Sequence, residues 1–169
     1  MDELNRELRS QAVHLGLCND WQGLWNKGWS KEKMAEMMYR GLDFCLKYHW
    51  PSNDFLIKHF DLTFRRGHGI YVNDKCSVNN LKESLILGAS EITMRYNGRS
   101  HGNVHLRDVA KLKLYAKNVS FVIVHLYEKA TVEAVQSDGA KVVLVKHSKD
   151  VTINIEGNVK IREEYDYLE

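Results

Sequence analysis

The second half of the chain repeats itself every 20 or 21 residues, and this period limits the fold more than any other feature. Apolar residues recur in three columns, namely Ile92, Leu112, Val132 and Ile153; Met94, Leu114, Ala134 and Ile155; and Val104, Val124 and Val145. Turn-forming residues recur in step with them, at Gly98, Asn118, Asp138 and Asn158. Self-similarity of this length is typical of stacked-repeat proteins, in which each unit buries its apolar face against its neighbours.

Between the turns, apolar and polar residues alternate, as in "KLKLYA" and "FVIVHL". This alternation predicts two short strands and two turns in each unit. One such unit would form a rung of a β-solenoid, with equivalent residues about 4.8 Å apart along the stack. We predict about four rungs. An antiparallel β-sandwich is the alternative, because strands at short regular intervals produce the same alternation.

The first half differs in composition, since all four tryptophans fall within residues 1–50 and the only proline is Pro51. The spacing of Leu4, Leu8 and Ala12 predicts a helix. A longer helix is expected to continue through Cys45 and to end before Pro51, which disfavours helix at the residue before it. Residues that favour helix N-caps precede three of the predicted helices: Ser30, Ser52 and either Asn19 or Asp20.

The change of pattern at "RRGHGIYV" indicates a hinge between the two halves. The predicted fold class is therefore α+β, with a helical cap domain at residues 1–66 and a β-solenoid domain at residues 67–169. Uncovered edge strands promote aggregation, so we expect the helices to cover the first rung. The acidic tail "REEYDYLE" is expected to protect the last rung.

Composition excludes several classes of protein. Apolar residues make up 44% and charged residues 27% of the 169 residues, which supports a packed core and excludes global disorder. The first residues lack the apolar region of a secretory signal, and no apolar run approaches the roughly 18–20 residues that span a bilayer. Cys18, Cys45 and Cys76 are an odd number at wide spacing, which fits neither a disulfide framework nor a zinc site. We therefore expect a cytoplasmic protein without membrane contact or a cofactor.

Trp21, Trp25 and Trp29 would share one face of an uninterrupted helix. Such a face would suit a partner, because tryptophan is enriched at binding hot spots. The alternative is that the three rings form the core that joins the helices to the first rung. Gly28 disfavours a continuous helix through all three.

His105 and His125 occupy the same place in successive units. If Val104 and Val124 point inward, both histidines point outward and stack on one another. Two stacked imidazoles would suit a metal ion or a pH-sensitive pair, and a solvated histidine ladder is the alternative. We expect the next unit to interrupt the column, with Lys146 in place of a histidine and His147 displaced.

Basic residues are dense between Arg95 and Lys117, where Asp108 is the only acidic residue. The basic side chains are Arg95, Arg99, Arg107, Lys111, Lys113 and Lys117. Lys111 and Lys113 would project outward on a solenoid and form a positive face. Binding of nucleic acid or another acidic ligand there is one hypothesis, although the net charge of the chain is only +2. An ordinary solvated face is the other hypothesis.

The chain carries no nucleophile elbow, paired zinc-ligand motif, P-loop or dinucleotide fingerprint. The period and the alternation over residues 84–161 resemble those of bactofilin-type scaffold domains. The layout of tryptophan-rich helices followed by "GIYVND" and repeats is similar to that of bacterial and phage-borne proteins. Neither resemblance implies an activity or a catalytic residue.

We therefore expect a non-catalytic protein that recognises a protein partner, or another copy of itself, through a rigid β-solenoid face. Three alternatives stay open at this point. One is a self-assembling scaffold, and another is a binder of nucleic acid or an acidic ligand through residues 95–117. The third is an enzyme that uses His105, His125 and Asp108.

Overall fold

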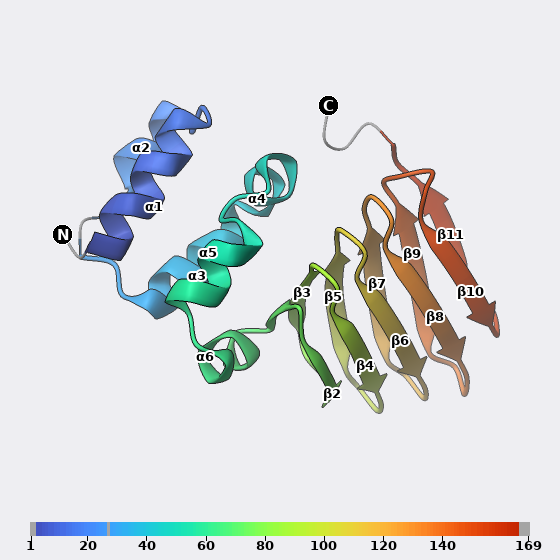
Figure 1. Ribbon diagram of the computed structural model, residues 1–169. Coiled ribbons are helices and arrows are strands. Elements are labelled where there is room, and N and C mark those ends of the chain that lie inside the picture. The colour runs from blue at the N-terminus through green and yellow to red at the C-terminus, as the bar shows by residue number, and fades with distance from the viewer. Residues whose placement is uncertain (1–2, 27, 166–169) are drawn as a thin grey trace. The chain divides into compact units, whose positions relative to one another are not determined.

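The computed structural model describes residues 3–26 and 28–165 (Figure 1). The chain separates into two compact units, one that ends at Phe64 and one that begins at Arg65. The first unit is helical, and the second is a β-solenoid of about four turns. The predicted α+β fold with a C-terminal solenoid is therefore confirmed. That the helical unit covers the first rung stays a prediction.

Short helices make up the first unit and lead into the second. They are α1 (Glu3–His14), α2 (Asn19–Leu24), α3 (Lys31–Arg40), α4 (Leu42–Tyr48), α5 (Asn53–His59) and α6 (Leu62–Gly67).

The expected helix N-caps are correct at two positions and wrong at one. The Ser30 Oγ accepts a hydrogen bond from the Lys33 backbone amide, and the Ser52 Oγ accepts one from that of Phe55. Cys18 holds the N-cap position of α2, so that helix begins at Asn19 instead of being capped by it. The predicted long helix is two helices, because Gly41 leaves helical geometry between α3 and α4.

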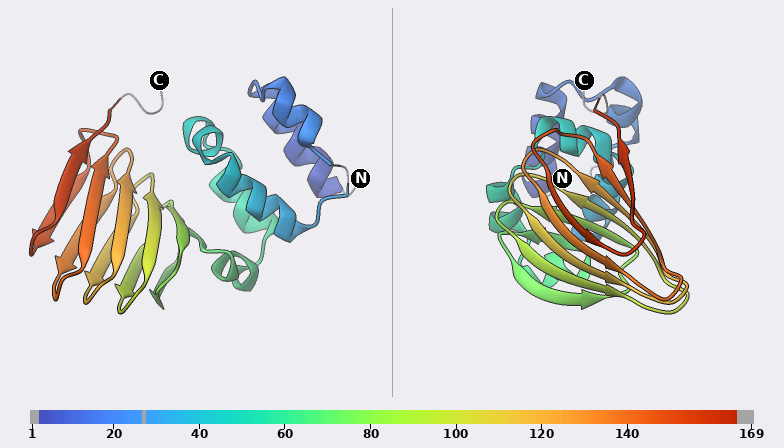
Figure 2. Two further views of the ribbon diagram at one scale, coloured as in Figure 1. Left: turned by 180° about the vertical axis from the view of Figure 1, so that it is seen from behind. Right: turned by 90° about the vertical axis from the view of Figure 1, so that its right-hand side faces the viewer.

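Two parallel sheets form the solenoid. The first sheet contains, in spatial order, β1 (Ile70–Val72), β3 (Glu83–Leu87), β5 (His101–Leu106), β7 (Phe121–Leu126), β9 (Lys141–Lys146) and β11 (Lys160–Glu163). The second contains β10 (Thr152–Glu156), β8 (Thr131–Gln136), β6 (Lys111–Ala116), β4 (Glu91–Tyr96) and β2 (Lys75–Asn79). Successive rungs overlie one another in the right-hand view of Figure 2. Parallel pairing throughout excludes the antiparallel sandwich.

Two of the three predicted apolar columns are confirmed by the strand register. Ile92 pairs with Leu112, and the same column continues through Val132 to Ile153. The column that begins at Met94 likewise runs to Ile155.

The third column was predicted wrongly at its last member. Val124 pairs with Leu144, so Val145 lies on the outer face and pairs with His125. The first two columns do contain a 21-residue spacing, from β8 to β10. It arises in the turn between β9 and β10, which holds one more residue than the equivalent turns. A turn accepts an additional residue because it does not alter which side chains face the core, whereas a shift within a strand reverses every side chain.

Side chains in the turns form ladders between rungs. The Asn97 amide donates to Asn80 Oδ1 at 2.9 Å, and the Asn118 side-chain amide donates to the side-chain oxygen of Asn97. On the opposite side, the Asp108 amide donates to Glu128 Oε2 at 3.1 Å. Asn80, Asn118 and Asp108 have φ values of 52°, 60° and 64°, a left-handed conformation that Asn and Asp tolerate well. In the last turn Gly157 takes this conformation, with φ of 93°, and the predicted turn residue Asn158 follows it.

A glycine inside the first complete rung is matched to a tyrosine. Gly102 faces the core in line with Val122, and Tyr96 is in line with Ala116. A Cβ at Gly102 would overlap the Tyr96 ring, whose hydroxyl donates to the Leu81 carbonyl at 2.8 Å. The large side chain of Tyr96 therefore fills the volume that the missing side chain leaves.

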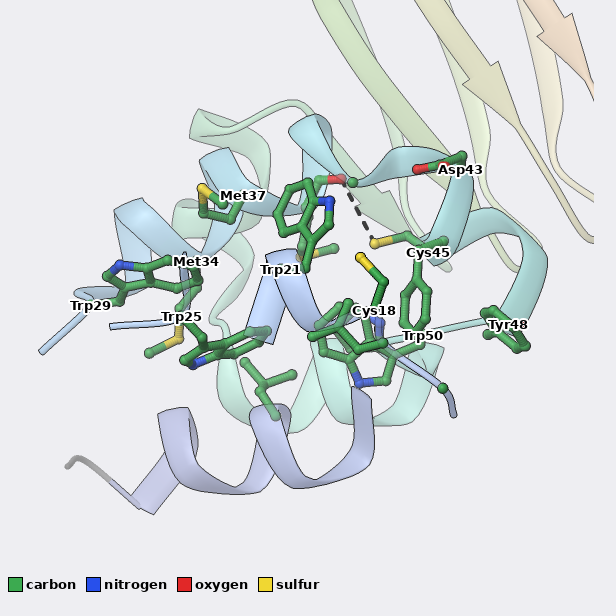
Figure 3. Close-up of a pocket in the computed structure, with 17 residues that line it drawn as sticks. Cys18, Trp21, Trp25, Trp29, Met34, Met37, Asp43, Cys45, Tyr48 and Trp50 are labelled. Atoms are coloured by element: carbon green, nitrogen blue, oxygen red, sulfur yellow. Dashed lines mark hydrogen bonds between the residues drawn. The ribbon is translucent and has the colours of Figure 1, made fainter. Parts of the chain in front are cut away.

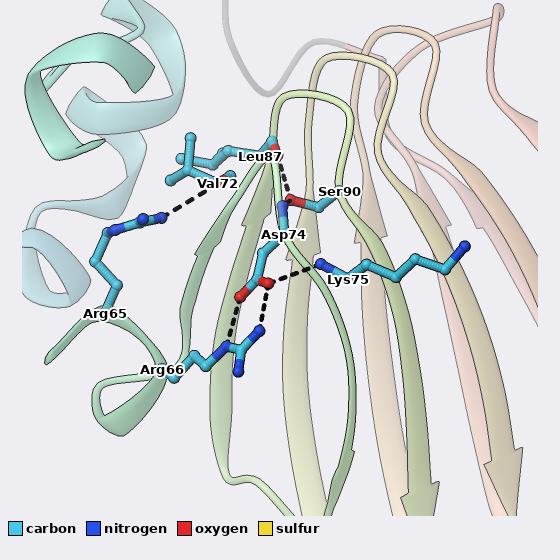
Figure 4. A network of polar contacts seen from close by, with 7 residues as sticks. All are labelled: Arg65, Arg66, Val72, Asp74, Lys75, Leu87 and Ser90. Atoms are coloured by element: carbon cyan, nitrogen blue, oxygen red, sulfur yellow. Dashed lines mark hydrogen bonds and ion pairs between the residues drawn. The ribbon is translucent and has the colours of Figure 1, made fainter. Parts of the chain in front are cut away.

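The segment "RRGHGIYV", which we predicted as the hinge, begins within α6, and its arginines bind β1 and the turn that follows it (Figure 4). Arg66 contacts the Asp74 carboxylate through two hydrogen bonds of 2.9 and 2.6 Å. This guanidinium holds the pKa of Asp74 below its ordinary value. Arg65 Nη1 donates to the Val72 carbonyl at 3.2 Å, and the Asp74 amide donates to Ser90 Oγ at 3.1 Å. The start of the solenoid is thus fixed by charge-assisted hydrogen bonds.

Candidate functional site

His105 of β5 and His125 of β7 stack on the outer face of the first sheet, as predicted. Their ring centroids lie 4.5 Å apart and their planes differ by 5°. Sequence reasoning missed the role of two further rings, since Tyr127 and His147 stack at 4.5 Å beside them and His147 lies 5.2 Å from His125. We call these four rings the histidine stack. It is largely buried, with His105 only 5% exposed.

The prediction that Lys146 takes the histidine column is wrong, because Val145 pairs with His125. His147 is displaced, as expected, but it lies in the place equivalent to Tyr127 in the rung before. The backbone amide of each donates to the carbonyl of the last residue of the neighbouring strand, Leu106 of β5 for Tyr127 and Leu126 of β7 for His147. Displacement thus brings His147 into the stack instead of removing it.

Hydrogen bonds determine which nitrogens of two rings carry protons. His147 Nδ1 lies 2.9 Å from the Glu164 carbonyl oxygen, which only accepts, so this nitrogen donates. In a neutral ring, His147 Nε2 then accepts, and its partner at 2.9 Å, His125 Nδ1, donates. His105 Nδ1 lies 3.5 Å from the Tyr127 hydroxyl.

Burial keeps the stack uncharged at neutral pH. It lowers the pKa of His105 to about 3, and the neighbouring His125 and His147 add to the effect. The pKa of His125 is lowered to about 4 by burial and by His147. An imidazole of such low pKa is a weak general base near neutral pH. His125 and His147 also direct one nitrogen each toward the other in a hydrogen bond, which disfavours metal chelation by this pair.

Arg107 does not contribute to a positive surface. It is 3% exposed, and its Nε lies 3.3 Å from Asp108 Oδ1. Arg107 occupies, one rung earlier, the place that Tyr127 and then His147 hold in the following rungs. Its backbone amide donates to the Ile86 carbonyl. A buried arginine that is paired with a carboxylate is not accessible to a ligand in solution.

Lys111 and Lys113 project outward from β6, as predicted, and each has a glutamate partner in a neighbouring rung that reduces the expected positive charge of this face. Lys111 lies 3.4 Å from Glu91, which also pairs with Lys75 at 2.9 Å. Lys113 lies 3.4 Å from Glu133 in the next rung. On the same sheet, the guanidinium of Arg95 lies over the ring of Tyr115 at 5.5 Å. Carboxylates in register with the lysines weigh against an acidic ligand on this face.

Trp21, Trp25 and Trp29 do not share one helix, because α2 ends at Leu24. They nevertheless line a single cavity in the helical unit, together with Trp50 (Figure 3). Trp25 contacts Trp29 with ring centroids 5.0 Å apart and Trp50 at 6.0 Å. The predicted aromatic surface is thus a concave wall, and Trp50 is the member that the helical pattern did not indicate.

The last rung leaves part of the apolar core exposed. β10 and β11 are the final strands of their sheets. Ile155 pairs with the buried Ala134 and Ile161 with the buried Leu144, so both isoleucines face the core side of their strands. They are nevertheless 47% and 43% exposed. We call the surface formed by Val151, Ile153, Ile155, Val159 and Ile161, with the outer edges of β10 and β11, the open end.

The described part of the acidic tail does not cross the open end. Glu163 pairs with Lys146 at 3.0 Å, and the Glu164 amide donates to the Lys146 carbonyl. These residues therefore continue along β9. The remainder of the predicted protective tail, residues 166–169, lies outside the described residues.

No protein-family model, no curated protein and no solved structure matches the chain. The similarity to bactofilin-type scaffold domains therefore stays a prediction from the repeat pattern. Within residues 3–26 and 28–165, no helix combines the length and the apolar character that a membrane span requires.

Proposed function

We propose that this protein is a non-catalytic scaffolding protein that binds a second copy of itself through the open end of its solenoid. The observation that supports this proposal is the exposure of Ile155 and Ile161, which face the core in a rung without a described rung beyond it. The next rung would normally cover such residues. A second open end offers an apolar layer and unpaired strand edges of the same kind.

The apolar contact offsets part of the cost of association. Full burial of an isoleucine side chain is worth about 1.5–3 kcal/mol. Because about half of each of two isoleucines is exposed, covering both contributes about that amount per copy. The resulting roughly 3–6 kcal/mol per dimer compares with an association cost of about 4–15 kcal/mol. Backbone hydrogen bonds between the edge strands must supply the rest, and we therefore expect a reversible dimer.

The two strands of the open end run in opposite directions (Figure 1). A two-fold axis can therefore place β10 of one copy antiparallel to β11 of the other, and the same pairing recurs on the other side. With Ile155 opposite Ile161 of the partner subunit, Glu156 falls opposite Lys160 of the partner subunit. Opposite charges on directly opposed residues stabilise an antiparallel pair. Pairing β11 with itself about Ile161 would instead bring Lys160 against Arg162 of the partner subunit, so we favour the β10–β11 arrangement.

The test is the solution mass of the full chain, measured by light scattering after size exclusion over a wide range of concentrations. We expect twice the chain mass of 19.6 kDa at high concentration. The double variant Ile155→Asp, Ile161→Asp should remain at the chain mass. Its matched control is Val109→Asp, Val119→Asp, which changes two apolar residues that are 50% and 63% exposed away from the open end. This control should still dimerise.

Charge reversal tests the arrangement of the two copies. Glu156→Lys should weaken the dimer, and adding Lys160→Glu should restore it. Circular dichroism establishes that each variant keeps its sheets. A wild-type chain that stays monomeric at its highest soluble concentration would overturn the proposal, as would equal effects of the two aspartate pairs. Failure of the charge reversal alone would reject the β10–β11 arrangement and retain the open end as the interface.

A further inference from the structure

The helical unit contains an apolar cavity that the proposed self-association does not use. Its volume is about 250 Å³. Six aromatic side chains line it: Trp21, Trp25, Trp29, Phe44, Tyr48 and Trp50. Most of the remaining lining consists of methionine, leucine and cysteine side chains from α1, α3, α4 and the loop between α1 and α2 (Figure 3). Concave, mostly aromatic sites with few polar groups are typical of small-molecule binding.

Hydrogen bonds hold one wall of the cavity in place. The indole N–H of Trp25 donates to Asn5 Oδ1 at 2.6 Å, and the Asn5 side-chain amide donates to the Asn26 carbonyl at 3.0 Å. Asn5 is fully buried in α1. Trp29 and Trp50 pack against the ring of Trp25. A wall fixed in this way loses little conformational entropy when a ligand binds.

Trp50 supplies an unused hydrogen-bond donor. Its side chain lines the cavity and is 8% exposed, and its Nε1 is buried without a hydrogen-bond partner among the described residues. The ring of Phe44 meets it edge-on, with centroids 5.5 Å apart. A buried indole N–H normally has a partner, because leaving it unpaired costs free energy. The Nε1 atom itself is closed off in this structure, so a ligand that carries an acceptor would satisfy this donor after a small movement of the Trp50 ring.

Size and charge limit the class of ligand. Among the described residues that line the cavity, Asp43 is the only charged one, which disfavours anions. At the packing density of protein interiors, the cavity volume corresponds to roughly ten non-hydrogen atoms. Tryptophan faces and methionine sulfurs both make favourable contacts with aromatic rings.

We propose that this cavity binds a small, uncharged, planar aromatic molecule of about two fused rings that carries a hydrogen-bond acceptor for the Trp50 indole. The proposal is independent of the self-association described above. It rests on the lining, the volume and the unpaired donor of the helical unit.

Quinoline and naphthalene test the proposal, because they share shape and size and only quinoline has an acceptor nitrogen. Titration calorimetry with the full chain should show one site per chain for quinoline. Naphthalene is more hydrophobic than quinoline, and this raises its affinity for every variant. The informative quantity is therefore the ratio of the two affinities, compared between variants. In Trp50→Phe the affinity of quinoline relative to naphthalene should fall by about two- to tenfold, the usual worth of one hydrogen bond. The control Trp21→Phe should keep the ratio.

The indole N–H signals of the four tryptophans in a nitrogen-15 NMR spectrum give a second measurement. The signal that is absent in Trp50→Phe should shift on addition of quinoline more than on addition of naphthalene. If neither probe binds at one site per chain, the cavity is not a site for aromatic molecules and the proposal is overturned. If both bind and Trp50→Phe leaves their ratio unchanged, the assignment of Trp50 as the donor is wrong.

Discussion

Mild acid should destabilise this protein through its histidine stack. In the folded chain, burial lowers the pKa of His105 to about 3 and that of His125 to about 4. An unfolded histidine has a pKa of about 6.5. Between these values the unfolded chain binds more protons than the folded chain. Stability is therefore fully present above about pH 6.5 and is lost progressively as the pH falls toward 4.

The magnitude follows from linkage. A pH of about 5 is roughly 1.5 units below the pKa of an unfolded histidine, whereas folded His105 is still neutral at this pH. The free energy of unfolding is therefore lower by about 2 kcal/mol than at neutral pH. His125 adds a smaller amount because it is less deeply buried. For a chain of this size, 2 kcal/mol corresponds to a melting temperature lower by about 4–8 °C. The carboxylates Asp74, Glu91 and Glu163 have lowered pKa values, so the stability that they contribute is lost mainly at lower pH than that of His105.

The perturbation that isolates His105 is His105→Leu. Leucine suits the position because Leu85 holds the same column in the preceding rung. The substitution also removes a buried nitrogen, Nε2, that has no hydrogen-bond partner among the described residues. Melting should be followed by the β-sheet signal in circular dichroism at about pH 7.5 and about pH 5. All four tryptophans precede the solenoid, so their fluorescence is not a measure of its unfolding.

We expect the difference in melting temperature between the two pH values to be smaller in His105→Leu by about 4–8 °C. The matched control is His101→Gln, at the exposed start of the same strand, which should behave like the unmodified chain. If His105→Leu keeps the full difference, or if the control reduces it equally, then burial of the stack does not determine the acid response.

Two further predictions concern the core of the solenoid. Gly102→Val should destabilise the fold by about 1–3 kcal/mol because it overlaps Tyr96, and adding Tyr96→Ala should restore stability, since this pair reproduces the next rung. Urea denaturation of both variants measures their stability. A double variant that is as unstable as Gly102→Val would contradict the proposed match between Gly102 and Tyr96. Leu114→Asp should cost more than about 4 kcal/mol, because Leu114 is fully buried, whereas Lys113→Thr should be nearly neutral. Similar losses in thermal melting would show that the two faces of β6 are assigned wrongly.

The sequence predicts the solenoid well because its period is a direct consequence of stacking. Two apolar columns could be assigned from spacing alone, since every member must face the same core. Val145 was misplaced because spacing does not show whether an additional residue lies in a strand or in a turn. Gly41 shows a second limit, since the helical pattern continues through it and only the backbone conformation ends α3.

The candidate sites were less predictable. Stacking of His105 and His125 follows from their equivalent places, but His147 joins through a neighbouring column. The ion pairs of Lys111 and Lys113 depend on carboxylates 20 residues away, which a local count of charge omits. Comparison at 20-residue spacing places Glu133 beside Lys113, and the same comparison with the preceding rung places Glu91 beside Lys111. Trp50 had no such signal, because its contact with Trp25 depends on how helices pack.

The ladder of identical registers has a consequence for how such a protein can change in length. Every interior rung presents the same pairing to the rung on either side, so one rung can be duplicated or deleted without altering either terminal surface. Each 20-residue insertion in register would lengthen the solenoid by about 4.8 Å. The length of the solenoid can therefore vary with the number of its repeats while the surfaces of its terminal rungs stay the same.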